Sequence, residues 1–256
     1  MSQLAVTLFN FREFCKTESD LDRTLDKVCD IGYEVVQVSA VPLAPEIIRK
    51  QLDSHRLSCC AVHEKLDVIL GDANALADKL DILGCDYVAL GAPPKDQRTA
   101  EGITDIVRKM DAQGAILKTR GKQLAYHNHQ FEFKRMGTDK IIFRRIWELT
   151  SPENVFSELD VYWVTRGGGN PVAWIKELGN RISVIHFKDF ALLDETGEPV
   201  FCEVGEGNLD WPGIIQACRE IGVTYYSVEQ DKPYLDRDIF ESARISFNNL
   251  KRFGLN

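Results

Sequence analysis

The stretch ISVIHFKD, residues 182–189, combines a short run of β-branched and aromatic residues with a polar end. A run of this kind, bounded by polar or turn-forming residues, is typical of a buried β-strand. The pattern occurs eight times along the chain, so we expect eight strands. They cover residues 4–9, 34–39, 57–63, 86–91, 122–128, 155–160, 182–187 and 225–230.

Segments with helical periodicity separate these strands. The first begins near Ser19 and Asp20, repeats apolar residues on one face and ends at Gly32. A later one begins at Asn170-Pro171, a capping residue followed by proline at the first helical position, and the last covers residues 236–252. Strands that alternate with helices, with no strand directly after another, predict parallel pairing through right-handed crossovers.

The chain shows no internal boundary, because no Pro/Ser-rich or charged stretch divides its 256 residues. An open doubly wound sheet is the structural alternative. It would usually carry a glycine-rich phosphate turn after the first strand, where this chain has Asn10-Phe11-Arg12. We therefore predict one α/β domain over residues 1–256, a single (β/α)8 TIM barrel with its active site at the C-terminal ends of the strands.

Composition excludes several classes of protein. The net charge of −8 argues against general affinity for a nucleic-acid backbone. No apolar run approaches the length of a membrane span, and the N-terminus lacks the pattern of a secretory signal. Seven cysteines without metal-binding spacing favour a reducing, cytoplasmic location over a disulfide framework. No sequence feature decides whether the barrel forms a homo-oligomer.

Polar side chains accumulate at the predicted C-terminal ends of the strands. Four of the five histidines lie there: His63, His127, His129 and His186. Alternate residues of a strand share a face, so His127 and His129 are expected to point inward together. The same holds for Glu158 and Asp160. A ring of His, Asp and Glu suits manganese, zinc, cobalt or iron better than calcium, so the sequence predicts a divalent metal at the barrel mouth.

Five stretches, taken in order, resemble the sugar phosphate isomerase/epimerase family of the xylose-isomerase-like TIM barrel superfamily. They are AYHNHQFEF (125–133), ELDVYW (158–163), VIHFKDF (184–190), EVGEGNLDWPGII (203–215) and SVEQD (227–231). The resemblance covers nearly the whole chain. It implies one divalent metal, Mn²⁺ before Zn²⁺, Co²⁺ or Fe²⁺, and Asp160, His186 and Glu229 match three of the four ligand positions.

The fourth ligand position departs from the family pattern. Many members place a glutamate on strand 5, where this chain has His127 followed by Asn128. His127 is the predicted ligand, with His129 as the alternative. Two-base epimerisation by carboxylates of strands 5 and 8 therefore does not transfer unaltered. The paired histidines resemble those of inosose dehydratase relatives, which eliminate water.

The predicted metal site and the family resemblance are consistent with three functions. The first is a metal-dependent isomerase or epimerase of a small sugar or keto-sugar, phosphorylated or not, acting through an enediolate. The second is a metal-dependent lyase or dehydratase on an inosose or 3-keto-glycoside. The third is a barrel that binds metal and ligand without turnover.

Several residues have predicted catalytic roles. Glu229 is the predicted base or metal-held carboxylate, and His129 or Glu132 the second acid/base group. Lys188 is expected to stabilise a developing oxyanion or a substrate hydroxyl, with an ion pair to Asp189 or Glu158 as its alternative role.

Four further residues are predicted to contact the substrate. His63 has a substrate-binding or structural role, while Trp163 and Phe9 offer aromatic faces to a sugar ring. Arg12 and the loop 205–208 are candidates for phosphate contact, although a turn-forming role is the safer interpretation of that loop.

Overall fold

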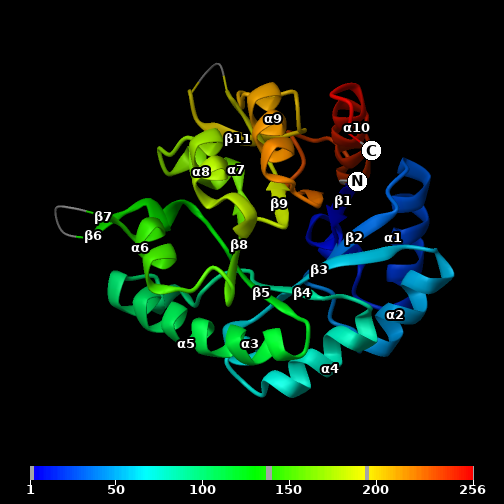
Figure 1. The fold of residues 1–256 in the computed structure, drawn as a ribbon. Coiled ribbons are helices and arrows are strands. Elements are labelled where there is room, and N and C mark those ends of the chain that lie inside the picture. The colour runs from blue at the N-terminus through cyan, green and yellow to red at the C-terminus, as the bar shows by residue number, and fades with distance from the viewer. Residues whose placement is uncertain (1–2, 137–139, 194–195, 256) are drawn as a thin grey trace.

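The computed structural model describes residues 3–136, 140–193 and 196–255. Eight parallel strands close into a barrel in the order β1-β12-β9-β8-β5-β4-β3-β2, with helices around the outside (Figure 1). The strands are β1 (Gln3–Thr7), β2 (Val35–Val38), β3 (Ser58–Glu64), β4 (Tyr87–Leu90), β5 (Gln123–His127), β8 (Val155–Asp160), β9 (Val184–Phe187) and β12 (Tyr225–Val228). Each overlaps one predicted strand, so the predicted (β/α)8 barrel is confirmed.

The helices begin and end at residues that suit those positions. In α1, the Thr17 side chain accepts from the backbone N–H of Asp20, and Gly32 ends the helix with a φ of 115°. Asn170 caps α8 as predicted. The helices are α1 (Glu18–Ile31), α2 (Pro45–Ser54), α3 (Leu66–Ile69), α4 (Ala73–Leu83), α5 (Ala100–Thr119), α6 (Ile142–Leu149), α7 (Val161–Arg166), α8 (Pro171–Leu178), α9 (Trp211–Ile221) and α10 (Ile239–Arg252). Short 3-10 helices are η1 (Leu8–Phe14), η2 (Lys95–Gln97), η3 (Gln130–Phe133) and η4 (Gly179–Arg181).

Two antiparallel hairpins interrupt the alternation of strand and helix. They are β6 (Arg135–Met136) with β7 (Lys140–Ile141), and β10 (Asp189–Leu192) with β11 (Pro199–Cys202). The expectation that no strand directly follows another was therefore wrong. Both hairpins lie in long loops that leave the C-terminal ends of β5 and β9, where a short ladder satisfies backbone polar groups.

Strand register places the polar residues of neighbouring strands side by side. His127 pairs with Glu158, Asp160 pairs with His186, and His186 pairs with Ser227. Paired residues of neighbouring parallel strands lie side by side, although strand tilt sets them at different heights along the barrel axis. The register therefore gathers side chains from four strands at the C-terminal mouth.

All seven cysteines are free thiols, and six of them are buried. The stability of the barrel therefore comes from packing and hydrogen bonds rather than from disulfide cross-links. Within the described ranges, no helix is both long and apolar enough to cross a membrane.

Candidate metal centre

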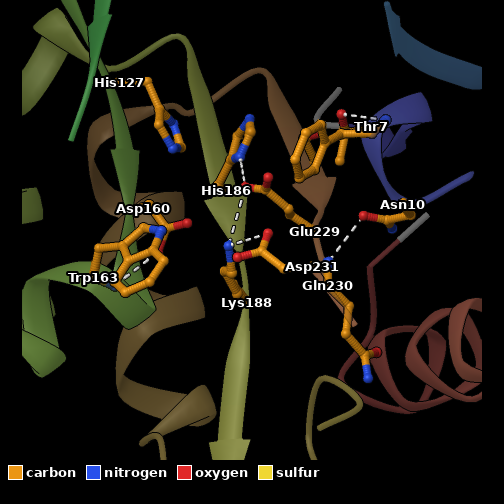
Figure 2. Close-up of polar contacts among 12 residues, drawn as sticks. Thr7, Asn10, His127, Asp160, Trp163, His186, Lys188, Glu229, Gln230 and Asp231 are labelled. Carbon is orange, nitrogen blue, oxygen red and sulfur yellow. Dashed lines mark hydrogen bonds and ion pairs between the residues drawn. The ribbon is translucent and has the colours of Figure 1, made fainter. Parts of the chain in front are cut away.

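Four buried side chains converge at the C-terminal mouth of the barrel (Figure 2). One ligand-type atom from each lies within 4.8 Å of those of the other three, and none of the residues is more than 5% exposed. His127 and Asp160 end β5 and β8, His186 lies in β9, and Glu229 directly follows β12. We call these four residues the upper layer. The structure thus brings the predicted ligand set together, and its role in binding metal stays a prediction.

Two buried atoms of the upper layer lack hydrogen-bond partners among the described residues. Oδ1 of Asp160 accepts from the backbone N–H of Trp163 at 2.8 Å, but its Oδ2 is unpartnered. Nδ1 of His127 is also unpartnered, although Oε2 of Glu158 lies 3.3 Å away. A buried polar atom without a partner costs about 1–3 kcal/mol. The imidazoles and carboxylates of the upper layer therefore fit a divalent transition-metal ion.

Burial and neighbouring charges shift the pKa values of this group. Burial raises the pKa of Asp160 to about 7 and lowers that of His127 to about 4. Burial would also raise the pKa of Glu229, but Lys188 and His186 together hold it well below its usual value. At neutral pH the site therefore offers an uncharged His127 ring and an ionised Glu229 carboxylate.

A second polar layer lies one step deeper in the barrel, since Glu158 and Ser227 stand two residues before Asp160 and Glu229. We call it the lower layer, and it consists of Gln37, Ser39, His63, Glu158 and Ser227. Oε1 of Glu158 accepts from Nε2 of Gln37 at 3.0 Å, and its Oε2 bonds to Nε2 of His63. The other ring nitrogen of His63 lies 3.1 Å from Oγ of Ser39. The hydrogen-bond donors and acceptors of these side chains therefore satisfy one another.

Lys188 places a buried positive charge beside the upper layer (Figure 2). Its Nζ lies 2.7 Å from Oδ1 of Asp231 and 3.8 Å from Oε2 of Glu229. It also faces the rings of Trp163 and Phe201 at 4.8 and 5.0 Å. Burial lowers its pKa, but the surrounding carboxylates outweigh that effect and raise it. The ion-pair partner is thus Asp231, and not Asp189 or Glu158 as the sequence suggested.

His129 lines the mouth between aromatic rings. Its ring centroid is 5.1 Å from that of His127, 5.4 Å from Trp163 and 5.6 Å from Phe131. Its buried Nδ1 has no hydrogen-bond partner in the described part of the chain. Burial holds its pKa well below the usual value, so the ring is a neutral base beside the upper layer.

Glu132 has a different position from the one its predicted acid/base role requires. One carboxylate oxygen accepts from the Tyr126 hydroxyl and the other from the backbone N–H of His129, both at 2.8 Å. Tyr126 precedes His127 on β5 and therefore points to the opposite face, toward the helices. The structure thus uses Glu132 to fix the turn after β5, which argues against the predicted role.

Two predicted substrate contacts are occupied by protein groups. The Arg12 guanidinium donates to the carbonyl oxygens of Phe9 at 2.8 Å and Asp231 at 2.9 Å, and lies 4.3 Å over the Phe9 ring. It therefore ties the end of β1 to the end of β12. His63 belongs to the lower layer, in agreement with its structural alternative. Trp163 remains a half-buried aromatic face at the mouth.

The glycine loop proposed for phosphate already holds an anionic group of the chain itself. The Asp189 carboxylate accepts from the backbone N–H groups of Gly205 at 3.0 Å and Gly207 at 3.1 Å, and from Nε1 of Trp211 at 2.5 Å. A Cβ at Gly207 would collide with this carboxylate. The candidate phosphate role of this loop is therefore corrected in favour of the turn-forming alternative.

Sequence reasoning missed Gln37 and gave no role to Asp231. Gln37 is the one polar residue of the strand Val35–Val38, and a polar side chain inside an otherwise apolar strand was the signal. Asp231 follows Glu229 by two residues, the spacing that places two side chains on one face.

The fold and the site together define a (β/α)8 barrel with a candidate divalent-metal centre at its mouth. A family model described as the xylose isomerase-like TIM barrel matches residues 25–248. The chain therefore belongs to the xylose isomerase-like TIM barrel family, which confirms the resemblance seen in its sequence.

Solved structures with the same fold include three proteins that are named for an activity. A sugar phosphate isomerase/epimerase from Parabacteroides distasonis aligns with a TM-score of 0.80 and 21% identity, covering 98% of this chain and 93% of that one. A probable 3-DHS dehydratase from Bacillus anthracis aligns with a TM-score of 0.72 and 14% identity, covering 98% of this chain and 99% of that one. An L-ribulose 3-epimerase aligns with a TM-score of 0.70 and 17% identity, covering 100% of this chain and 95% of that one. No curated protein matches the sequence. At these identities the likeness establishes the fold alone.

Proposed function

We propose that this protein is a metal-dependent isomerase or epimerase of a sugar or keto-sugar that acts through an enediolate. The observation that carries the proposal is the convergence of four buried ligand-type side chains at the barrel mouth, with Oδ2 of Asp160 unpartnered among the described residues. Membership of the xylose isomerase-like family supports it, as do structural relatives named isomerase or epimerase.

The proposed cofactor is one divalent ion, with Mn²⁺ as first choice. The upper layer, His127, Asp160, His186 and Glu229, would hold it. When bound, such an ion supplies the positive charge that stabilises an enediolate derived from a carbonyl and its neighbouring hydroxyl. Zn²⁺, Co²⁺ and Fe²⁺ suit the same mixture of imidazole and carboxylate groups.

The remaining chemistry is assigned to side chains around the upper layer. Glu229, kept ionised by Lys188 and His186, removes the proton from the carbon next to the carbonyl. His129, held neutral by burial, exchanges a proton with the substrate at a second position. The Lys188 ammonium stabilises negative charge that develops on substrate oxygen. Trp163 and Phe201 cover Lys188 and limit its contact with water.

A metal-dependent lyase or dehydratase on an inosose or 3-keto-glycoside is the second candidate. The observation that favours it is His127, because the strand-5 member of the upper layer is an imidazole instead of a carboxylate. Glu229 is then the carboxylate best placed to remove the α-proton, and loss of a β-substituent completes the reaction. A structural relative named as a probable dehydratase is in keeping with this alternative.

Deuterium exchange distinguishes the two activities. We would incubate the Mn²⁺-reconstituted protein in D₂O with ketohexoses, an inosose and 3-keto-glucosides, and follow the products by NMR. An isomerase or epimerase incorporates deuterium beside the carbonyl and yields an isomer, whereas a lyase yields an unsaturated product or a free aglycone.

Two variants control this experiment. Glu229→Gln should abolish turnover, whereas Glu241→Gln, which changes an exposed glutamate on α10, should leave it unchanged. If the metal-loaded wild type neither exchanges nor converts any of these substrates, the catalytic proposal fails. The barrel is then one that binds metal and ligand without turnover.

A further inference from the structure

Gln37 stands at the centre of the lower layer and joins four strands of the barrel. Its side chain is fully buried. Nε2 of its amide donates to Oε1 of Glu158 at 3.0 Å. Its Oε1 accepts from Oγ of Ser227 at 2.9 Å and lies 2.7 Å from Nε2 of His186. The amide therefore connects the lower layer directly to a member of the upper layer.

The chemistry of these partners fixes the direction of every hydrogen bond. An ionised carboxylate only accepts, so the amide nitrogen of Gln37 must face Glu158. The amide oxygen must then face His186, and because that oxygen also only accepts, Nε2 of His186 must carry a hydrogen. The Ser227 hydroxyl donates to the same oxygen and supports this orientation.

Nδ1 of His186 faces the upper layer and donates to Oε2 of Glu229 at 2.6 Å, since an ionised carboxylate only accepts. Both ring nitrogens therefore carry a hydrogen here, and because Gln37 and Ser227 fix the one on Nε2, the hydrogen on Nδ1 is the one that a metal ion would replace. We propose that Gln37 is a positioning residue that selects the Nε2–H tautomer of His186 and thereby presents Nδ1 as the metal ligand. This inference rests on the proposed metal-dependent function, and hydrogen bonding behind a ligand is a general means of orienting metal-binding histidines.

A second metal ion in the lower part of the mouth is the competing explanation. Ligand-type atoms of His63, His127, Glu158 and His186 also lie within 4.8 Å of one another. However, both oxygens of Glu158 already accept hydrogen bonds, from Gln37 and His63. An ion there would have to displace these partners, so the geometry favours a supporting network over a second site.

Gln37→Met tests the proposal, because methionine has a similar length and lacks the amide oxygen. Its Kd for Zn²⁺, measured by competition with a chelator, should rise about 10–100-fold, as is typical when the partner behind a ligand is lost. Ser227→Ala is the matched control. It removes another bond to the same oxygen but leaves the amide oriented by Glu158, so its affinity should stay near that of the wild type.

The double variant Gln37→Glu/Glu158→Gln tests the direction of the bonds. It exchanges the amide and the carboxylate, keeps the total charge and retains an acceptor opposite Nε2 of His186. We expect it to recover most of the affinity that Gln37→Met loses. A purely structural role for Gln37 in packing would give no such recovery.

Nitrogen NMR of the histidines in the Zn²⁺-loaded protein gives a readout that does not depend on activity. In the wild type, Nε2 of His186 should carry a hydrogen and Nδ1 should show the shift of a metal-bound nitrogen. Metal on Nε2, or an unchanged Zn²⁺ affinity in a folded Gln37→Met variant, would overturn the inference. If the wild type binds no metal, the proposed function fails as well. If Gln37→Met does not fold, the wild-type spectrum still shows which nitrogen of His186 binds the metal.

Discussion

The upper and lower layers of the barrel mouth contain similar residues but differ in the pairing of their polar atoms. Ligand-type atoms lie within 4.8 Å of one another in two groups of four residues. One group is the upper layer, and the other combines His63 and Glu158 of the lower layer with His127 and His186 of the upper layer. Proximity alone therefore does not identify the metal site. In the upper layer, Oδ2 of Asp160 and Nδ1 of His127 lack hydrogen-bond partners among the described residues. In the lower layer, both oxygens of Glu158 accept hydrogen bonds.

Buried carboxylates elsewhere extend this comparison. Asp189 is saturated by backbone N–H groups and an indole, and Glu132 by a hydroxyl and a backbone N–H. Both hold a loop in place. Asp160, by contrast, keeps one buried oxygen without a partner in the described part of the chain. Asp189 and Glu132, whose bonds are complete, thus support structure, whereas Asp160 at the barrel mouth has an oxygen available to a ligand.

Lys188→Met should produce the largest loss of activity among residues outside the upper layer. Its ammonium faces Glu229 at 3.8 Å, and loss of one group that stabilises oxyanion charge typically lowers kcat about 10²–10³-fold. Steady-state kinetics on the metal-loaded variant would measure this, with metal content expected to stay at the wild-type level.

The matched control is Lys122→Met. Lys122 is also buried and paired, with Asp81 and Asp86, each at 2.6 Å, but it lies before β5, at the opposite end of the barrel. This variant should lose stability and keep kcat. Equal losses of kcat in both variants would contradict a specific role for Lys188.

Asp189→Asn should affect stability more than metal binding. An amide in place of this carboxylate weakens several charge-assisted bonds to the loop that follows β11, which costs about 1–3 kcal/mol of the free energy of unfolding. Urea denaturation and chelator competition would measure the two effects. A large fall in metal affinity with little loss of stability would contradict the distinction between carboxylates whose hydrogen bonds are complete and those with an oxygen free to bind metal.

Glu132→Gln should produce the smallest effect on activity, and its main consequence should be a change in the pH dependence of stability. Burial raises the pKa of Glu132 from 4.5 to about 8, so between these values the folded state retains a proton that the unfolded state releases. This group's contribution to stability is thus full below pH 4.5 and declines as the pH rises toward 8. Glutamine does not titrate, so the variant should lack that decline when Tm is measured from pH 5 to 8. Parallel curves for variant and wild type would contradict the assignment.

Local sequence patterns were sufficient to predict the barrel strands and the polar residues at their C-terminal ends, whereas the ligand set of the upper layer was predicted from the resemblance to the family. The strands are short β-rich runs, and alternation within β8 placed Glu158 and Asp160 on the inner face. The partners of these residues were harder to predict, because they come from distant parts of the chain. Gln37 bonds to Glu158 across 121 positions, and Lys188 reaches Asp231 across 43. The occupied loop around Asp189 was missed for the same reason, since a glycine-rich turn does not reveal which group it encloses.

Metal stoichiometry tests the distinction between the two layers most directly. We would reconstitute wild type, Asp160→Asn and His63→Ala with Mn²⁺ and measure bound metal by inductively coupled plasma mass spectrometry. The account predicts one equivalent in the wild type and in His63→Ala, and almost none in Asp160→Asn. Two equivalents in the wild type that fall to one in His63→Ala would show that the lower layer is itself a metal site. A wild type without metal would contradict the proposed centre altogether.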